Sequence, residues 1–228
     1  MQQADVWDFP TRLFHWLLVA ALIFQYVSGE ILDDAMQWHF YIGYFTIGLI
    51  VFRLLWGFVG HTHSRFSQFI VGPGRVVNYV KGQDSQHYLT HNPLGALSVI
   101  AILAIVATQA ISGLFIDDDI FFQGPWYAAV DKDTVSLANT IHHTFYKVII
   151  GLAILHIIAI GFYQRVKKQA IVQSMIHGKK PTQKAHAYPT FSRSLVWRFL
   201  IVVAISAAIV YLGVEVLSPE PVEEFFGF

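Results

Sequence analysis

The chain has 228 residues, of which 55% are hydrophobic and only 13% charged, against about 25% charged residues in an ordinary soluble domain. This deficit of charge, with a mean hydropathy of +0.50, predicts an all-α membrane protein. Basic and acidic residues balance at 15 each, so the net charge does not indicate a nucleic-acid partner. The chain has no cysteine, which excludes disulfides, thiolate-bound zinc, cysteine-held iron–sulfur clusters and covalent haem attachment through C-x-x-C-H.

Five apolar runs are long enough to cross a bilayer, which takes about 20 mostly apolar residues per helix. In chain order they are residues 13–32, 40–59, 94–116, 141–163 and 195–217. The third is uncharged throughout, whereas the second contains Arg53 and the fourth contains Lys147. Asp5 and Asp8 precede the first run without the basic segment of a secretory signal. We therefore expect the first span to be retained, and we detect no internal repeat.

The loops between these spans alternate in charge, which sets the expected orientation through the positive-inside rule. Two loops are acidic and carry Asp33, Asp34, Asp117, Asp118, Asp119, Asp131 and Asp133 against one basic residue, Lys132. Two loops are basic and carry Arg65, Arg75, Lys81, Arg165, Lys167, Lys168, Lys179, Lys180, Lys184 and Arg193. We expect the N-terminus and the basic loops in the cytoplasm. The tail, residues 218–228, with Glu220, Glu223 and Glu224, is then outside.

Eleven histidines are many for a membrane protein, because an ionisable group in hydrocarbon is costly and usually functional. His15 opens the first span on the cytoplasmic side, and His39 and His142 open the second and fourth spans on the outer side. His156 follows His142 by 14 residues, which is about four turns, or roughly 21 Å, and returns to nearly the same helix face. The sequence thus predicts an inner pair, His15 with His156, and an outer pair, His39 with His142.

Imidazoles on both sides of a flat macrocycle fill both axial positions of haem iron, which suits electron transfer. His143 competes with His142 for the outer site, but it points about 100° away from the face of His156. We therefore favour His142. The remaining histidines fall in the cytoplasmic loops, where we expect solvated or interfacial side chains: His61, His63, His87, His91, His177 and His186.

Three basic residues are candidates to contact the propionates of such haems. Arg53 lies within a span, so its charge needs a partner there, and a propionate of the inner haem could provide one. Alternatively, the Arg53 side chain extends to the membrane interface. Lys147 lies about one turn from His142 and could serve the outer propionates or reach the surface instead. Arg12 lies near the membrane on the cytoplasmic side, close to the level of the inner pair.

Several short stretches resemble the bacterial cytochrome b561 family, which includes the b-type cytochrome subunit of nickel–iron hydrogenases. They are VWDFPTRLFHW at residues 6–16, RLLWGFVG at 53–60 followed by Ser64-Arg65-Phe66, HNPLG at 91–95, and SGLF at 112–115. The spacing of His142 and His156 completes the pattern. Together these matches cover residues 6–165, and their order and spacing make the resemblance specific.

The resemblance implies a four-helix transmembrane bundle that binds two non-covalent b haems through His15, His39, His142 and His156. It also implies electron exchange in a respiratory chain between quinone and a periplasmic partner, a c-type cytochrome or a hydrogenase, across the bacterial inner membrane. The fifth span is a departure from four-helix relatives. We therefore expect a di-haem domain at residues 1–194 and an added helix with an acidic periplasmic tail at residues 195–228. Acidic residues at 117–119 and in the tail could steer a basic partner.

Two other functions stay open. Some relatives resemble superoxide oxidases that use ubiquinone as acceptor, but an anionic substrate favours a positive funnel, and only Lys132 and Lys147 lie among the outer acids. A transporter without haem could instead use the histidines as a proton relay. Haem stoichiometry would separate these possibilities.

Overall fold

The computed structural model describes residues 2–84, 86, 88–118, 122–182 and 193–219. Within them, five helices are long and apolar enough to cross a membrane, which confirms the predicted all-α membrane fold. These are α1 (Phe9–Glu30), α2 (Met36–Val59), α5 (Pro93–Ser112), α6 (Lys132–Arg165) and α8 (Arg193–Tyr211), which a π-helical turn, η3 (Leu212–Val216), extends. Asp119, Lys184, His87, His186, Glu220, Glu223 and Glu224 lie outside the described residues.

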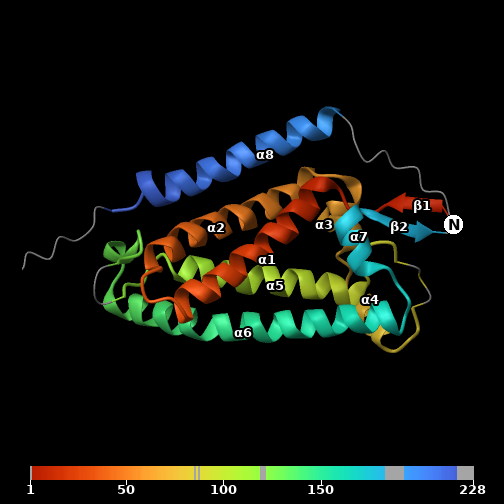
Figure 1. The fold of residues 1–228 in the computed structure, drawn as a ribbon, viewed down its shortest axis with the longest axis horizontal. Helices are drawn as coiled ribbons and strands as arrows, with labels where there is room; N and C mark the ends of the chain where they lie inside the picture. The colour runs from red at the N-terminus through yellow and green to blue at the C-terminus, as the bar shows by residue number, and fades with distance from the viewer. Residues whose placement is uncertain (1, 85, 87, 119–121, 183–192, 220–228) are drawn as a thin grey trace, which may run out of the picture.

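Shorter elements connect the long helices and gather mainly at one end of the bundle (Figure 1). They are β1 (Gln2–Asp5), η1 (Thr62–Ser64), α3 (Phe66–Phe69), α4 (Pro73–Val80), η2 (Tyr127–Ala129), α7 (Ile171–His177) and β2 (Lys179–Thr182). We call the end with β1, β2, α3, α4 and α7 the sheet end. The opposite end, with the α1–α2 and α5–α6 connections, is the loop end.

Helix α6 is longer than the span predicted at residues 141–163, because it begins at Lys132. Asp131 caps it: the backbone amide of Thr134 donates to Oδ1 at 2.8 Å, and this bond lowers the pKa of the carboxyl below its ordinary value. A search for apolar runs detects only the membrane-crossing part of a helix, so it missed the polar first turns. His142 therefore lies well inside α6 and does not open it.

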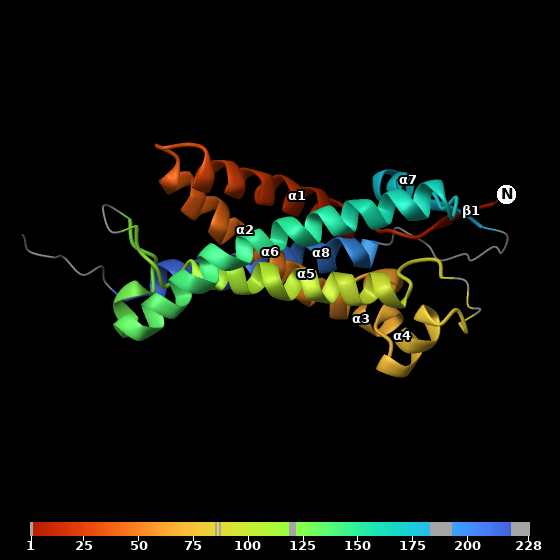
Figure 2. The same ribbon diagram turned by 90° about the horizontal axis from the view of Figure 1, so that it is seen from below.

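The long helices pack as two hairpins with a fifth helix alongside (Figures 1 and 2). Helix α1 packs on α2, α5 packs on α6, and the hairpins meet mainly through α2 and α5. Helix α8 lies along α2. The apolar core forms around α2, where Phe52 stacks on Trp56 with ring centroids 5.8 Å apart. Helix α6 has one buried residue among those described, Ala138, so most of its length is left to lipid or to the space between the hairpins.

A buried polar network fastens the start of α1 to the end of α2. The Asp8 carboxylate accepts hydrogen bonds from the Thr11 amide and from the indole Nε1 of Trp56, both at 2.9 Å. Thr11 in turn donates its hydroxyl to Ser64 at 2.8 Å. Asp8 is thus both the N-cap of α1 and the acceptor for a fully buried tryptophan, which sets the angle between α1 and α2.

The sequence did not predict the small sheet at the sheet end, in which β1 and β2 run antiparallel with Asp5 opposite Lys179. The Gly178 carbonyl, just before β2, accepts from the backbone amides of Val6 and Trp7. Gly178 has a positive φ of 80°, and a Cβ there would lie 2.6 Å from the Trp7 carbonyl oxygen, so glycine is required. The sheet holds the N-terminus against the segment that follows α7.

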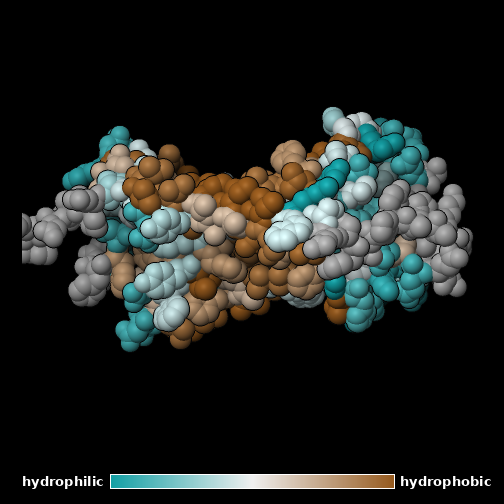
Figure 3. Space-filling view, turned by 90° about the horizontal axis from the view of Figure 1, so that it is seen from above, coloured by the Kyte–Doolittle hydropathy of each residue, from teal (hydrophilic) through white to brown (hydrophobic). Residues whose placement is uncertain are grey.

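The surface carries an apolar belt between two polar ends (Figure 3). The described basic residues of the α2–α5 and α6–α8 connections lie at the sheet end, and Asp33, Asp34, Asp117, Asp118 and Asp131 lie at the loop end, although Asp84 is at the sheet end. The chain is therefore a multi-pass membrane protein by the length, composition and arrangement of its helices.

Candidate functional site

Two histidines from different helices face each other toward the loop end. His39 is in the first turn of α2 and His142 lies in α6, and their ring centroids are 6.2 Å apart with planes at 69°. Helices α2 and α6 do not otherwise pack closely, so the two imidazoles reach across the space between the hairpins. His143 is exposed, and its ring lies 6.0 Å from that of His142. Of the adjacent residues His142 and His143, His142 is thus the one that faces His39.

Each of these imidazoles is held through its Nδ1 atom by a serine of the neighbouring helix. Ser28 Oγ lies 3.0 Å from Nδ1 of His39, and Ser112 Oγ lies 3.2 Å from Nδ1 of His142. The serine hydroxyls donate to the carbonyls of Gln25 and Gln109. Because their own hydrogens are committed, they accept from the rings. This makes Nδ1 the protonated nitrogen and leaves the lone pair of Nε2 for a ligand.

A glycine follows each serine and lets the ring approach the helix. A Cβ at Gly29 would lie 3.0 Å from Cε1 of His39, and a Cβ at Gly113 would lie 2.9 Å from Cε1 of His142. Larger residues at these positions would therefore push the imidazoles out of place. The two halves of the pair use the same local geometry on separate hairpins.

This geometry comes from a repeated five-residue motif that the sequence search missed. Residues 25–29 read Q-Y-V-S-G near the end of α1, and residues 109–113 read Q-A-I-S-G at the end of α5. Gln25 also donates to the His39 carbonyl at 3.1 Å, and the Gln109 carbonyl lies 3.0 Å from Nδ1 of His142. The recurrence of Gln-x-x-Ser-Gly, each before a helix that carries a histidine, is the signal that could have found these residues.

The other predicted pair, His15 of α1 and His156 of α6, lies toward the sheet end. The two side chains are within electrostatic range of each other. The Nδ1 atom of His15 is buried and has no hydrogen-bond partner among the described residues. Gly151 lies between His142 and His156 on α6, and a Cβ there would meet no atom within 4 Å. The α6 surface between the two pairs is therefore uncovered on the side of Gly151.

His91 departs from the expected solvated loop histidine. Its ring packs between Trp7 and Phe69, with centroids 4.9 Å away in both cases. Burial, with positive charge on Arg53 nearby, lowers the pKa of His91 to about 4, so the imidazole is neutral at pH 7. His156 is also within electrostatic range. His91 belongs to the HNPLG stretch, in which Asn92 caps α5 by accepting from the Gly95 amide.

Comparisons with known proteins show the family of the chain. The prokaryotic cytochrome b561 family matches it over residues 6–178, a range that includes His15, His39, His142 and His156. The chain belongs to this family. It is therefore a membrane electron-transport protein of a b-type haem family, which favours electron transfer over the transporter alternative.

The cytochrome is also similar to curated relatives over most of its length. It is 21% identical over 208 residues to a probable Ni/Fe-hydrogenase B-type cytochrome subunit of Azotobacter chroococcum mcd 1, which covers 76% of this chain and 86% of that protein. It is 24% identical over 215 residues to the protein of the same description in Bradyrhizobium diazoefficiens, covering 77% and 85%. No solved structure matches the chain at a significant level.

The outer pair fits the iron of a b haem. A metal bonded to two imidazole nitrogens at about 2 Å each would hold the ring centroids roughly 6 Å apart, because each centroid lies about 1 Å behind its nitrogen. The centroids of His39 and His142 are 6.2 Å apart. Their Nδ1 atoms are already occupied by hydrogen bonds, as is usual for histidines that bind metal through Nε2.

Arg53 suits an anionic group near the other pair. Its side chain is only 3% exposed, and its guanidinium lies 4.7 Å from the Phe66 ring centroid. One terminal nitrogen, Nη1, is buried without a hydrogen-bond partner among the described residues. Asp8 is within electrostatic range, but it does not occupy this donor. Arg53 thus keeps one buried donor available.

The two other basic candidates are placed differently. Arg12 donates through a terminal nitrogen to the Ile176 carbonyl of α7, so part of its guanidinium is used at the sheet end. Lys147 is exposed, and its Nζ lies 5.4 Å from the Tyr146 ring centroid. Among the described residues we find no contact that joins Lys147 to the outer pair.

Proposed function

We propose that this cytochrome holds two b haems and relays electrons between quinone and a periplasmic redox partner. His39 and His142 would hold the outer haem, and His15 and His156 the inner one. The observation that carries the proposal is the facing of His39 and His142 at 6.2 Å, with each Nδ1 engaged by a serine. When bound, a haem with two imidazole ligands supplies a one-electron carrier without an open coordination position.

The chain's own residues orient and neutralise the cofactors in this proposal. Ser28 and Ser112 fix the imidazole tautomers, and Gly29 and Gly113 let the rings reach the ligand position. Arg53 would donate to an inner propionate through its free nitrogen. Arg12 would support the inner site from the sheet end, and Lys147 would extend to the outer propionates only by leaving Tyr146.

The proposed setting is the bacterial inner membrane, with the sheet end in the cytoplasm and the loop end in the periplasm. The support is the charge difference between the two ends. Residues 1–194 would form the di-haem domain, because all four ligands lie in α1, α2 and α6. Residues 195–228 would add one helix and an acidic tail.

The proposed partner is a hydrogenase or a c-type cytochrome that docks at the acidic loop end. Relatives that align with most of this chain are described as probable Ni/Fe-hydrogenase B-type cytochrome subunits. Asp117, Asp118 and Glu215 are among the described acids at that end, and they would attract a basic surface.

Haem stoichiometry and reduced-minus-oxidised spectra of the purified protein test the proposal. We expect two low-spin b haems per chain in the wild type. His39→Ala and His142→Ala should each remove the same haem, and His15→Ala and His156→Ala should remove the other. His143→Ala is the matched control and should keep both. A wild type without haem, or loss of haem from His143→Ala alone, would contradict the assignment.

A further inference from the structure

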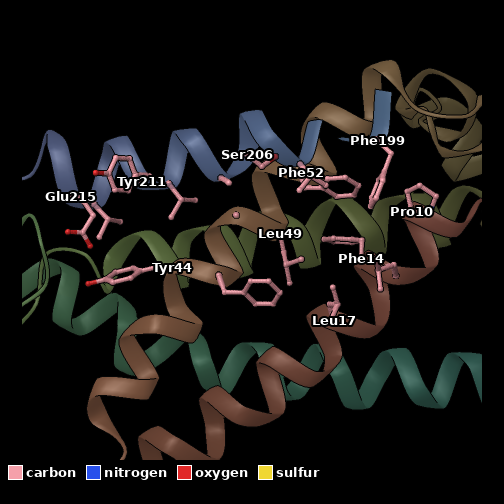
Figure 4. A pocket seen from close by; sticks show the side chains of 17 residues that line it. Pro10, Phe14, Leu17, Tyr44, Leu49, Phe52, Phe199, Ser206, Tyr211 and Glu215 are labelled. Carbon is pink, nitrogen blue, oxygen red and sulfur yellow. The ribbon is translucent and has the colours of Figure 1, made fainter. Parts of the chain in front are cut away.

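Helix α8 lies outside the family match at residues 6–178, yet it forms a partly open hollow with the core. Between α8, α2 and the first turns of α1 there is an apolar cavity of about 550 Å³ (Figure 4). Phe14, Leu49, Phe52, Phe199 and Val203 are among the residues that line it. Because it lies at membrane depth and opens between helices, it is suited to an apolar chain.

The loop end of this cavity adjoins a second hollow of about 420 Å³ that is more polar. Tyr44, Val214 and Glu215 line both hollows, so one extended molecule can occupy the two. Tyr41, Gln123 and Ser218 add polar side chains to the second hollow. Figure 4 shows Tyr44 and Glu215 close to the same end of the apolar cavity. Together the two hollows form one channel. Its apolar part can hold a hydrocarbon chain, and its polar part, which we call the chamber, can hold the polar head group of the same molecule.

A break in α8 places the polar residues of this chamber. The helix widens into the π-turn η3 (Leu212–Val216), and this turn contains Glu215. The indole Nε1 of Trp126 donates to the Gly213 carbonyl at 2.7 Å, which anchors the turn to the α5–α6 connection. π-turns are rare, and they occur frequently at binding sites.

Charge decides which amphiphile the channel suits. No lysine, arginine or histidine is among the residues that line the two hollows. A phospholipid phosphate would meet the Glu215 carboxylate without a cation to compensate it. A neutral head with carbonyl or hydroxyl groups could hydrogen-bond to Tyr44 and Glu215.

We propose that the channel between α8 and α2 binds an isoprenoid quinone, with its ring in the chamber of Tyr41, Tyr44 and Glu215 and its chain along Phe52 and Phe199. This deepens the proposed function and rests on it, because it names where the quinone binds. Tyr41 and Tyr44 follow His39 on α2 by about 3 and 7.5 Å along the axis, but they are rotated from it by about 200° and 140°. The quinone ring would thus lie level with the outer pair, on the opposite face of α2, and away from Arg12 on the cytoplasmic side.

Photolabelling locates the quinone without depending on haem. The purified full chain would be illuminated with an azido-ubiquinone, and the labelled peptides would be identified by mass spectrometry. We expect label on α8 and on the Tyr41–Tyr44 part of α2. Ala207→Trp should fill the channel and reduce the label at least tenfold, whereas Ile205→Trp, on the exposed face of α8, is the matched control and should not. Tyr44→Phe keeps the side-chain volume and should weaken labelling several-fold.

The outcomes distinguish the alternatives. Label at Arg12 and α7, or equal label in Ala207→Trp and wild type, would overturn the proposal. So would displacement of a co-purified phospholipid by Ala207→Trp with unchanged quinone labelling, because the channel would then hold lipid. If the haem spectra fail but the label remains on α8, the haem assignment is wrong and the quinone site stands.

Discussion

At the scale of single residues, the serines behind His39 and His142 have the clearest chemical role. Each accepts from an Nδ1–H group, which makes the imidazole a stronger electron donor through Nε2. The Gln109 carbonyl lies 3.0 Å from Nδ1 of His142, and the Gln25 backbone is likewise a second hydrogen-bond partner of the His39 imidazole. The two serines should therefore have similar effects.

Ser28→Ala should raise the midpoint potential of the outer haem by about 20–60 mV, because losing one hydrogen bond of about 0.5–1.5 kcal/mol weakens ligand donation to the oxidised iron. Ser112→Ala should raise the potential by a similar amount, since one glutamine backbone partner remains at each ring, Gln25 at His39 and Gln109 at His142. Redox titration of the visible spectrum measures both. Thr108→Val is the control on α5, because the Thr108 hydroxyl donates to its own helix at the Ala104 carbonyl. An unchanged potential in both serine variants would contradict this explanation.

Gly113→Ala should reduce the outer haem content to a minor fraction, because its Cβ would lie 2.9 Å from Cε1 of His142 and displace the ring. Gly29→Ala should act in the same way on His39, though less strongly at 3.0 Å. The measurement is haem per protein in the purified variants. Gly161→Ala on α6 is the control, since a Cβ there meets no atom within 4 Å. Full haem content in Gly113→Ala would show that the ring position is not critical.

At the scale of elements, Asp8 links two helices that carry proposed haem ligands. It caps α1, which carries His15, and it binds Trp56 at the end of α2, which carries His39. At the other end of the same hairpin, Gln25 and Ser28 of α1 hydrogen-bond to His39 of α2. Polar contacts thus fix the register of α1 against α2 at both ends.

Asp8→Ala should destabilise the protein by about 2–3 kcal/mol, because it removes a helix cap and leaves the buried Trp56 indole without an acceptor. Asp8→Asn should lose less stability, since the amide oxygen of the asparagine side chain can still cap α1. Thermal denaturation followed by tryptophan fluorescence in detergent measures the loss. Identical melting temperatures for wild type and Asp8→Ala would mean that other contacts hold α1 against α2.

At the scale of the whole molecule, α8 is an addition to a bundle that already carries all four proposed haem ligands. It nevertheless covers the core, because Leu195 and Val202 are buried there and Phe199 packs edge-on against Trp56 at 6.3 Å. The four-helix core and the fifth helix thus share an apolar interface. The haem sites and the quinone channel should therefore respond differently to the loss of α8.

Deleting residues 195–228 should leave both haem signals in place and lower the melting temperature by several degrees, because core side chains around Phe52 and Trp56 become exposed to lipid or detergent. Azido-ubiquinone labelling of α2 should be lost at the same time. Deletion of residues 220–228 alone is the control and should change neither property. Loss of both haems from the longer deletion would contradict a separate domain at residues 1–194.

Much of the fold could be predicted from the sequence, because the length of an apolar segment and the charge of a loop depend only on residues close together in the chain. The five spans and the shared face of His142 and His156 required only helical periodicity. The polar first turns of α6 and the β1–β2 sheet were missed, since neither has an apolar pattern. His91 was misjudged because its burial depends on Trp7 and Phe69, which are distant in sequence.

The sequence by itself determined the membrane-spanning character of the chain and the number of spans, because hydropathy and length are properties of one helix at a time. Tertiary structure decided that His142 faces His39 while His143 is exposed, that serines of neighbouring helices hold the two rings, and that α8 forms a partly open hollow with α2. These features depend on the rotation and separation of helices, which arise from packing between segments far apart in the chain.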